Sequence, residues 1–377
     1  MNSTRRTGWI RALLANAAVG AGLLALGTAF VGLGGCAPSS TMFRGDAAHS
    51  GAAQAFGVDQ LDRLQWKSKS GAKTYGAPLA TDKAVYWGVS TGEVIAVDNK
   101  GNELWRYKTG KNVESSPARR GDTLYVGSDD GHLYALAAAS GKLKWSFKAD
   151  GMVYSSPTIS GDTVYFGSTN GQVYALDALT GKLRWQHKTQ GAVYSSPAVA
   201  DGTLYVGCDD THLYALDAAT GKERWTFRTG GRVFSSPAVS GQTVYFGSDD
   251  HNFYAVDINT GQQRWVYRTH NKIYASPAVK DETVYVASTD DSLYALNTHS
   301  GKPRWQFAAD GPLYSSPVLA GKVLYVGSTD GYLYAIDRDS GKRLWRFRAD
   351  NKIYAAPAAA GGSVYFLDAG GDLYALQ

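Results

Sequence analysis

The stretch that decides the fold is residues 153–185, which read VYSSPTISGDTVYFGSTNGQVYALDALTGKLRW. Forty residues further on, residues 193–225 read VYSSPAVADGTLYVGCDDTHLYALDAATGKERW, and a third copy follows over 233–265. The tryptophan that ends each copy recurs at an unbroken spacing of 40, at Trp105, Trp145, Trp185, Trp225, Trp265, Trp305 and Trp345. A period of about 40 residues with four short β runs per unit is typical of a β-propeller, in which each repeat forms one blade.

Each repeat predicts four strands joined by short turns. In the copy over 193–225, strand A is expected near 194–199, strand B at 203–207, strand C at 213–217 and strand D around Trp225. The turns carry Gly, Asp or Asn, which suit tight hairpins. Strands B and C are apolar on both faces, which indicates burial between two neighbouring blades.

The prolines that begin strand A count the blades. There are eight of them, at Pro78, Pro117, Pro157, Pro197, Pro237, Pro277, Pro317 and Pro357. Strand C of the eighth repeat is followed by no strand D, whereas Trp66 precedes Pro78 by the 12 residues that also separate Trp105 from Pro117. We therefore expect an all-β, single eight-bladed propeller of four-stranded antiparallel blades over 62–377. The N-terminal strand around Trp66 should close the ring on the last blade and remove the open edges.

The first residues predict export. Residues 1–35 combine an arginine-rich start with an apolar run and end in small residues, as a secretory signal peptide does. The sequence LGGC over 33–36 resembles the bacterial lipoprotein cleavage box, which implies lipidation of Cys36 and a tether and lead-in segment over 36–61. Ala37 after the cysteine resembles a sorting signal for the outer membrane, so we expect a lipid anchor there, on the periplasmic face of a Gram-negative cell.

Charge and cysteine content narrow the partners. Three of the 38 basic residues lie in the signal, which leaves 35 against 33 acidic residues and gives no electrostatic case for nucleic acid. Cys36 and Cys208 are the two cysteines of the sequence, so with Cys36 lipidated no disulfide forms within the chain. Cys208 replaces a serine of sister repeats and is expected to be a small buried thiol.

Residues 175–185, ALDALTGKLRW, resemble the tryptophan-docking motif of quinoprotein-type propellers. The resemblance implies that each indole packs between neighbouring blades and that the Asp caps the turn before the tryptophan. Ala137 and Asn297 replace this Asp, so looser turns are expected there. The structural docking tryptophans are Trp66, Trp105, Trp145, Trp185, Trp225, Trp265, Trp305 and Trp345.

Candidate binding residues are expected where the repeats disagree, at the mouth where the D–A loops and the acidic B–C turns gather. Two positions before the strand-A tyrosine the sequence gives two basic sectors, and Glu114 replaces the tyrosine itself in one repeat. One interpretation is a solvated rim of mixed charge. The other is a rim that holds an anionic partner. The candidate rim residues are Lys73, Glu114, Arg232, Lys272 and Lys352.

Catalytic and metal motifs are not found in the sequence. The seven histidines are scattered, and no His, Cys or carboxylate spacing predicts a metal site. Quinoprotein dehydrogenases, which bind pyrroloquinoline quinone and calcium, are larger and use two neighbouring cysteines, and this chain has no such pair. We therefore expect no enzyme activity, no quinone and no calcium.

The BamB family, lipoprotein subunits of the machine that assembles outer-membrane β-barrels, is similar in its lipoprotein box, length and eight blades. That resemblance implies a non-catalytic, lipid-anchored scaffold with an envelope protein as partner, of which the barrel-assembly machine is the candidate. Two alternatives stay open. The chain is a quinone-dependent dehydrogenase, or it is a scaffold for another envelope complex.

Overall fold

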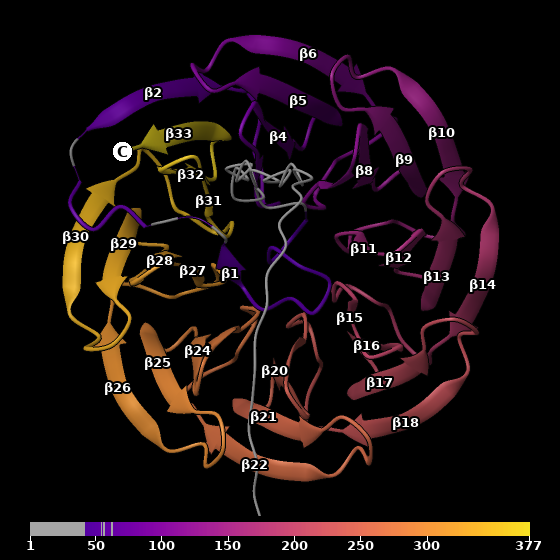
Figure 1. The fold of residues 1–377 in the computed structure, drawn as a ribbon, viewed down its shortest axis with the longest axis vertical. Coiled ribbons are helices and arrows are strands. Elements are labelled where there is room, and N and C mark those ends of the chain that lie inside the picture. Colours follow the sequence, from indigo (N-terminus) through magenta and orange to yellow (C-terminus); the bar gives the residue numbers. More distant parts are fainter. Residues whose placement is uncertain (1–41, 54, 56, 62) are drawn as a thin grey trace, which may run out of the picture. The chain divides into compact units, whose positions relative to one another are not determined.

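The computed structural model describes residues 42–53, 55, 57–61 and 63–377. The signal segment and Cys36 lie outside the described residues. Within the described part all regular structure is β-strand, arranged as eight sheets around a central axis (Figure 1). The predicted eight-bladed all-β propeller is confirmed. No helix in this part of the chain is long and apolar enough to cross a bilayer.

The first four blades follow one another along the chain, each with its strands ordered from the axis outward. Their strands are β3 (Leu79–Ala80), β4 (Ala84–Gly88), β5 (Glu93–Asp98) and β6 (Glu103–Lys108); β7 (Ala118–Arg120), β8 (Thr123–Gly127), β9 (His132–Ala137) and β10 (Leu143–Lys148); β11 (Thr158–Ser160), β12 (Thr163–Gly167), β13 (Gln172–Asp177) and β14 (Leu183–Lys188); β15 (Ala198–Ala200), β16 (Thr203–Gly207), β17 (His212–Asp217) and β18 (Glu223–Arg228).

The last four blades repeat this order, with two additions from the N-terminal part of the chain. The short strand β1 joins blade seven, and β2 completes blade eight. The strands are β19 (Ala238–Ser240), β20 (Thr243–Gly247), β21 (Asn252–Asp257) and β22 (Gln263–Arg268); β23 (Ala278–Lys280), β24 (Thr283–Ala287), β25 (Ser292–Asn297) and β26 (Pro303–Ala308); β1 (Ala52–Ala53), β27 (Val318–Ala320), β28 (Val323–Gly327), β29 (Tyr332–Asp337) and β30 (Arg343–Arg348); β31 (Ala358–Ala360), β32 (Ser363–Leu367), β33 (Asp372–Leu376) and β2 (Leu64–Lys69).

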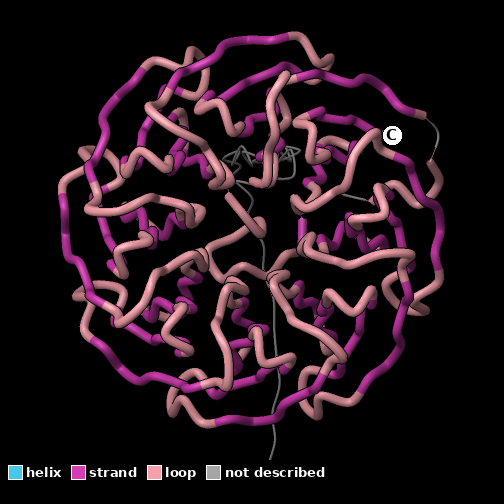
Figure 2. The backbone as a smooth tube through the Cα atoms, turned by 180° about the vertical axis from the view of Figure 1, so that it is seen from behind, coloured by secondary structure: helices cyan, strands magenta, loops and turns pink. Residues whose placement is uncertain are grey.

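Burial follows the sequence pattern of each strand. The second strand of every blade is buried at all positions, and the third mainly at its central positions, because neighbouring blades cover both faces of these strands. The outer strand alternates between exposed and covered residues, since only its inward face meets another blade. Figure 2 shows the same radial arrangement from behind, with loops running over each face.

The docking tryptophans form a belt between blades, which we call the docking belt. In each blade the indole N–H donates to a backbone carbonyl of the next blade at 2.8–3.3 Å. The Trp185 ring lies against Gly221, where a Cβ would stand 2.5 Å from the ring carbon Cε3 and φ is +72°. Only glycine fits this approach and this backbone conformation without strain.

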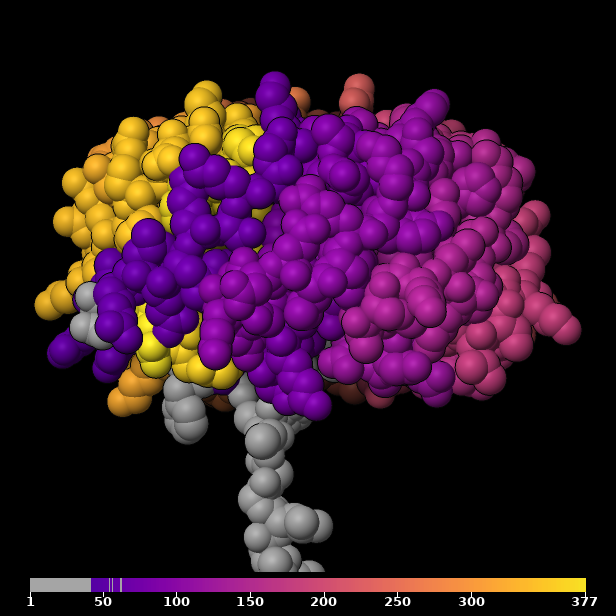
Figure 3. Space-filling view, turned by 90° about the horizontal axis from the view of Figure 1, so that it is seen from above, coloured from indigo at the N-terminus to yellow at the C-terminus, as the bar shows by residue number. Residues whose placement is uncertain are grey.

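The ring closes as predicted. Strand β2 pairs antiparallel with β33, and Trp66 stands opposite Ala375. The Trp345 indole donates to the carbonyl of Val58 at 2.9 Å, so the N-terminal segment also supplies the acceptor that the next blade supplies elsewhere. Figure 3 shows these indigo N-terminal residues lying against the yellow residues of the last blade.

The turns before the tryptophans correct one expectation. Asn297 was expected to loosen its turn, but its side-chain oxygen accepts the amide and the hydroxyl of Ser300, each at 3.0 Å. Asp177 accepts the same two groups from Thr180 at 2.9 and 2.8 Å. An amide oxygen therefore replaces the carboxylate here. Among the described turns of this motif, the one at Ala137 has no side-chain acceptor at that position.

Residues 42–53, which we call the plug segment, wind along the inner strands on the side of the A–B turns. Four successive inner strands donate a backbone N–H to it, from Val199 to Ala47, Val239 to Ala48, Val279 to Ser50 and Leu319 to Gly51, at 2.6–2.9 Å. The sequence predicted only a tether and lead-in segment for this stretch. Its backbone instead satisfies the inner edges of four blades.

Two buried polar side chains hold the plug segment. The Arg44 guanidinium donates to the carbonyl of Pro317 at 2.7 Å and also to the carbonyl of Pro277. Gly51 leaves room for it, because a Cβ there would lie 2.0 Å from the guanidinium. His49 is fully buried and bonds Thr158 at 3.0 Å, and burial with the nearby Arg44 charge lowers the pKa of His49 to about 3. The histidine is therefore neutral at physiological pH.

Candidate functional site

The central channel forms a cup that opens at the mouth where the D–A loops and B–C turns meet. Its volume is about 180 Å³, and Phe43 of the plug segment lies at its base. Around the wall runs one residue from the start of each inner-strand segment, a set that we call the collar. The collar consists of Tyr75, Glu114, Tyr154, Tyr194, Phe234, Tyr274, Tyr314 and Tyr354.

The aromatic members of the collar pack in sequence around the axis. Consecutive ring centroids lie 5.4–5.8 Å apart from Tyr154 through Tyr354 to Tyr75. Aromatic pairs at this spacing stabilise one another by about 0.5–1.5 kcal/mol each. Glu114 stands between Tyr154 and Tyr75 and is the one break in the aromatic series.

A belt of serines beneath the collar explains the repeated Ser-Ser-Pro sequence. In each of six consecutive blades, a backbone N–H donates to the Oγ of the equivalent serine in the next blade at 2.9–3.0 Å. The pairs are Ala77–Ser116, Ser116–Ser156, Ser156–Ser196, Ser196–Ser236, Ser236–Ser276 and Ser276–Ser316. These bonds fix the spacing of the inner strands, so the collar above them is held at set positions.

Glu114 lies in an environment that opposes its charge. Burial and the neighbouring Asp129 carboxylate raise the pKa of Glu114 to about 7, while the Asn112 side chain acts in the opposite sense. Burial likewise raises the pKa of Asp129, whose Oδ1 is buried without a hydrogen-bond partner in the described part of the chain. Burial first, and then these carboxylates, raise the pKa of Tyr154 to about 12.

Two of the predicted basic residues lie over the collar. The Lys272 ammonium is 5.9 Å from the centroid of Tyr274, and the Arg232 guanidinium is 5.9 Å from that of Phe234. Lys272 is also 3.5 Å from the Asp249 carboxylate. In blades five and six the two cations therefore make cation–π contacts with collar rings, and Lys272 also forms an ion pair.

The other two predicted basic residues lie on adjacent blades at the same mouth. Lys73 and Lys352 are exposed, and their backbone carbonyls accept amides of the B–C turns of their own blades. Their collar neighbours Tyr75 and Tyr354 contact each other at 5.8 Å. All five candidate rim residues are thus grouped around one opening, with Glu114 on the blade next to that of Lys73.

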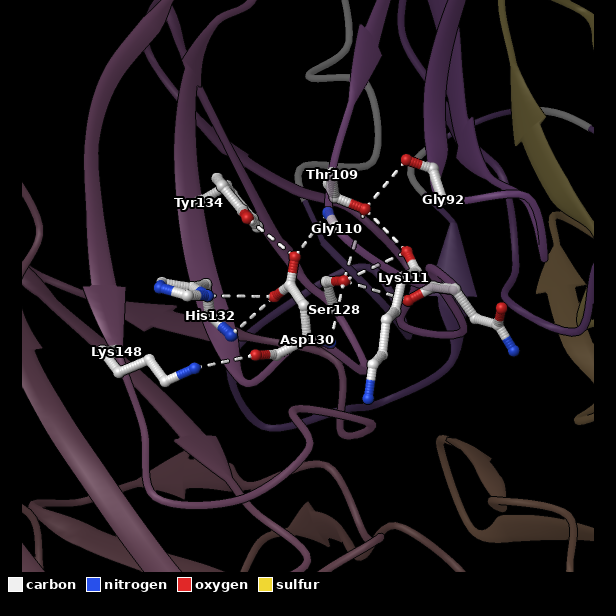
Figure 4. Close-up of polar contacts among 10 residues, drawn as sticks. Gly92, Thr109, Gly110, Lys111, Ser128, Asp130, His132, Tyr134 and Lys148 are labelled. Carbon is white, nitrogen blue, oxygen red and sulfur yellow. Dashed lines mark hydrogen bonds and ion pairs between the residues drawn. The ribbon is translucent and has the colours of Figure 1, made fainter.

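In each acidic B–C turn one aspartate has a structural role, because its carboxylate accepts hydrogen bonds from neighbouring groups of the protein. The sequence did not reveal this role. Asp130 accepts hydrogen bonds from the Tyr134 hydroxyl at 2.8 Å, the Gly110 amide at 2.6 Å and the His132 amide at 2.9 Å (Figure 4). Burial opposes the charge of Asp130, but these bonds outweigh it and lower its pKa. The tyrosine bond recurs at Asp210, Asp250, Asp290 and Asp330. The signal in the sequence was a tyrosine four residues after each of these acids.

Cys208 is fully buried, and burial raises the pKa of its thiol to about 11. Its sulfur lies 3.5 Å from the Thr189 hydroxyl and 3.5 Å from the Ala192 carbonyl. A protonated, inaccessible thiol fits the expected packing role. Among residues that the structure describes, no group of three or more His, Cys, Asp or Glu side chains is arranged to hold a metal ion.

Eight four-stranded blades with docking tryptophans and an N-terminal closing strand define the class, an eight-bladed β-propeller. Residues 53–196 match the family model described as outer membrane protein assembly factor BamB. Residues 200–377 match a second model, described as the β-propeller of the beta-alanine-activating enzyme. Each model covers less than half of the chain. No curated protein sequence matches it.

Solved structures of different function share the fold. BamB from Moraxella catarrhalis is 22% identical with a TM-score of 0.73, over 84% of this chain and 99% of that one. The quinohemoprotein alcohol dehydrogenase from Comamonas testosteroni is 17% identical with a TM-score of 0.77, over 90% of this chain and 80% of that one. The computationally designed Ika8 protein is 17% identical with a TM-score of 0.75, over 81% and 96%. Identities this low establish the fold alone.

Proposed function

We propose that this propeller is a non-catalytic scaffold of the cell envelope that takes part in assembling outer-membrane β-barrel proteins, as a BamB-like protein. The observation that carries the proposal is the match of residues 53–196 to the BamB model. The even ring supports the non-catalytic part of the proposal, since the repeats leave short loops at the mouth from which no lid can be built. Such a mouth offers a broad docking surface in place of a deep, lidded pocket.

We also propose that the chain works without pyrroloquinoline quinone and calcium. The quinone is a flat polycarboxylate, whereas the cup wall carries the carboxyl group of Glu114, with Asp129 close behind it, and these charges would repel it. The cup volume of about 180 Å³ also falls below the roughly 300–1,000 Å³ of small-molecule pockets. The residues around the axis therefore do not fit the cofactor of the quinoprotein dehydrogenases.

The proposed location is the periplasmic face of the outer membrane, with the chain held by a lipid on Cys36. The LGGC sequence over 33–36 and the likeness to BamB support this placement. A Cys36→Ala variant is expected to leave the membrane fraction. Recovery of that variant in the outer membrane would contradict the lipid anchor.

The test is photo-crosslinking of the full-length protein in its own membranes. Benzoylphenylalanine replaces Lys272 or Lys352 at the mouth, and Lys280 or Lys322 at the A–B turns serves as the matched control. A β-barrel assembly protein crosslinked only from the mouth would support the proposal. A different envelope complex would assign the scaffold to another system. Dye-linked alcohol oxidation on adding the quinone and calcium would overturn the non-catalytic assignment.

The predicted basic sectors supply a second, sharper test. If an acidic surface of the partner docks there, Lys272→Glu with Lys352→Glu should weaken partner binding by about tenfold or more, mainly through slower association at low salt. The matched charge reversal at the opposite face, Lys280→Glu with Lys322→Glu, should leave binding unchanged. Equal effects of the two pairs would show that net charge, and not the sectors, controls association.

A further inference from the structure

We propose that the break in the collar at Glu114 is a binding site for an organic cation, an ammonium or guanidinium group on a short aliphatic chain. This site goes beyond the proposed scaffold role and does not depend on it. Two sources carry the same chemistry, a free amine or guanidine and the side chain of a lysine or arginine on another protein.

The first support is the missing countercharge of Glu114. The groups that face it are the Asp129 carboxylate, the Asn112 side chain and the Tyr154 phenol. Lys111 lies near Asp129, and no ion pair to Glu114 is formed within the described part of the chain. A carboxylate that is partly buried beside a second one is stabilised by a cation more than by any other ligand.

The second support is the way in which the collar already binds cations. Arg232 and Lys272 lie over Phe234 and Tyr274, two positions before their own collar residues. The equivalent positions in blades two to four are Asn112, Met152 and Ala192, which carry no charge. The chain therefore places cations over the collar rings of blades five and six, whereas Lys73 of the adjacent blade one forms neither an ion pair with Glu114 nor a ring contact among the described residues.

The third support is the shape and chemistry of the cup around the gap. Tyr75 and Tyr154 flank Glu114 and are 43% and 38% exposed, so ring surface remains open to a ligand. No collar tyrosine hydroxyl donates to a protein acceptor among the residues described. Phe43 gives the cup an apolar base, and the cup volume of about 180 Å³ suits a head group with a few methylenes. Carboxylate and aromatic faces together are the usual receptor for such cations.

The test uses the full-length protein in detergent and isothermal titration calorimetry. The probes are n-butylguanidinium and the peptide acetyl-Gly-Gly-Arg-Gly-Gly-amide, with norleucine replacing arginine in the control peptide. The protein variants are Glu114→Gln, Glu114→Tyr, and the matched control Glu282→Gln at the opposite face. Glu114→Tyr restores the residue of the sister blades, so it is expected to fold.

At pH 8 the wild type is expected to bind both cationic probes and to ignore the norleucine peptide. Each Glu114 variant should weaken binding by about tenfold or more, and Glu282→Gln should not change it. Binding should weaken similarly at pH 5.5, where Glu114 is protonated. Binding of the peptide alone would identify a protein side chain as the ligand, whereas binding of both would show that the head group suffices. Wild-type affinity in Glu114→Gln, or no binding of either cation at pH 8, would overturn the proposal.

Discussion

The docking belt and the collar follow the same 40-residue period, but they differ in how strictly they keep it. Every blade docks its indole on a carbonyl of its neighbour within the same narrow range of distances, even at the seam. The collar keeps its aromatic residue in seven positions and breaks at Glu114. The repeated tryptophan contacts therefore stabilise the outer part of the ring. The collar position that departs from the repeat, Glu114, is where one blade can differ in function.

Removing one member of the docking belt should have the largest effect. Trp185→Ala is expected to lower the free energy of unfolding by about 3–5 kcal/mol, because it empties a buried site and removes one of the two donors to the Ala218 carbonyl, the other being the Tyr165 hydroxyl. Urea denaturation followed by circular dichroism measures the change. The control is Leu179→Ala, whose side chain is 79% exposed and should cost less than about 0.5 kcal/mol. Equal costs for the two variants would refute the structural role of the belt.

Loosening the plug segment should have the next largest effect. Arg44→Ala leaves the Pro277 and Pro317 carbonyls without donors, and is expected to cost about 2–3 kcal/mol. Hydrogen exchange should speed up at the amides of Val279 and Leu319, which donate to this segment, and stay slow at Ser156 of the serine belt. Arg228→Ala, at an exposed arginine, is the control. Unchanged exchange at Val279 would show that the plug segment does not depend on Arg44.

Replacing Glu114, the one non-aromatic collar residue, should raise the stability at neutral pH, whereas the two preceding changes lower it. The raised pKa of Glu114, about 7, means that the native state binds its proton more tightly than the unfolded state. Wild-type stability should therefore fall as pH rises from about 4.5 to 7. Glu114→Gln should be more stable than wild type at pH 8 by about 1 kcal/mol, a figure reduced for partial exposure, and equal at pH 4. A destabilised variant at pH 8 would contradict the assigned burial cost.

The smallest effect is expected at the capped turns of the docking motif. Hydrogen bonds from Arg224 and Thr220 lower the pKa of Asp217 to about 2. Its contribution should be present above pH 4 and disappear as the pH falls toward 2. Because this turn is exposed, Asp217→Asn should cost a few tenths of a kcal/mol at pH 7 and nothing at pH 2. Acid titration of stability measures this, with Glu223→Gln as the control. A cost that stays constant with pH would assign the effect to the turn backbone.

Sequence reasoning succeeded where the period supplied redundant signals. Tryptophan spacing, the strand-A prolines and the position of Trp66 each gave the ring and its closure, and burial of both faces of strands B and C followed from their composition. Glu114 stood out because it breaks a column of tyrosines. The contact of Lys272 with Tyr274 could not be foreseen, since it depends on the side-chain direction at the loop.

The plug segment escaped prediction because it repeats nothing. Its residues are small and polar, and its strand-like pairing with successive inner strands leaves no alternation to detect. The available signal was a single arginine and a single histidine, Arg44 and His49, in a stretch otherwise poor in long side chains. The structural role of one aspartate in each acidic B–C turn was missed for another reason. Charge at a turn predicts solvent exposure on average, and these carboxylates bond inward instead.

The carbonyl of Val58 accepts the Trp345 indole across 287 residues of chain. A contact of this sequence separation cannot stabilise the protein until seven blades have folded next to one another. The loop-closure entropy of this contact is therefore lost in the last step of folding, and we expect that step to be slow. The N-terminal residues are synthesised first, yet their partners are synthesised last. The contacts that close the ring can therefore form only after the last blade has folded. Until then the N-terminal strand keeps an unpaired edge to which chaperones can bind.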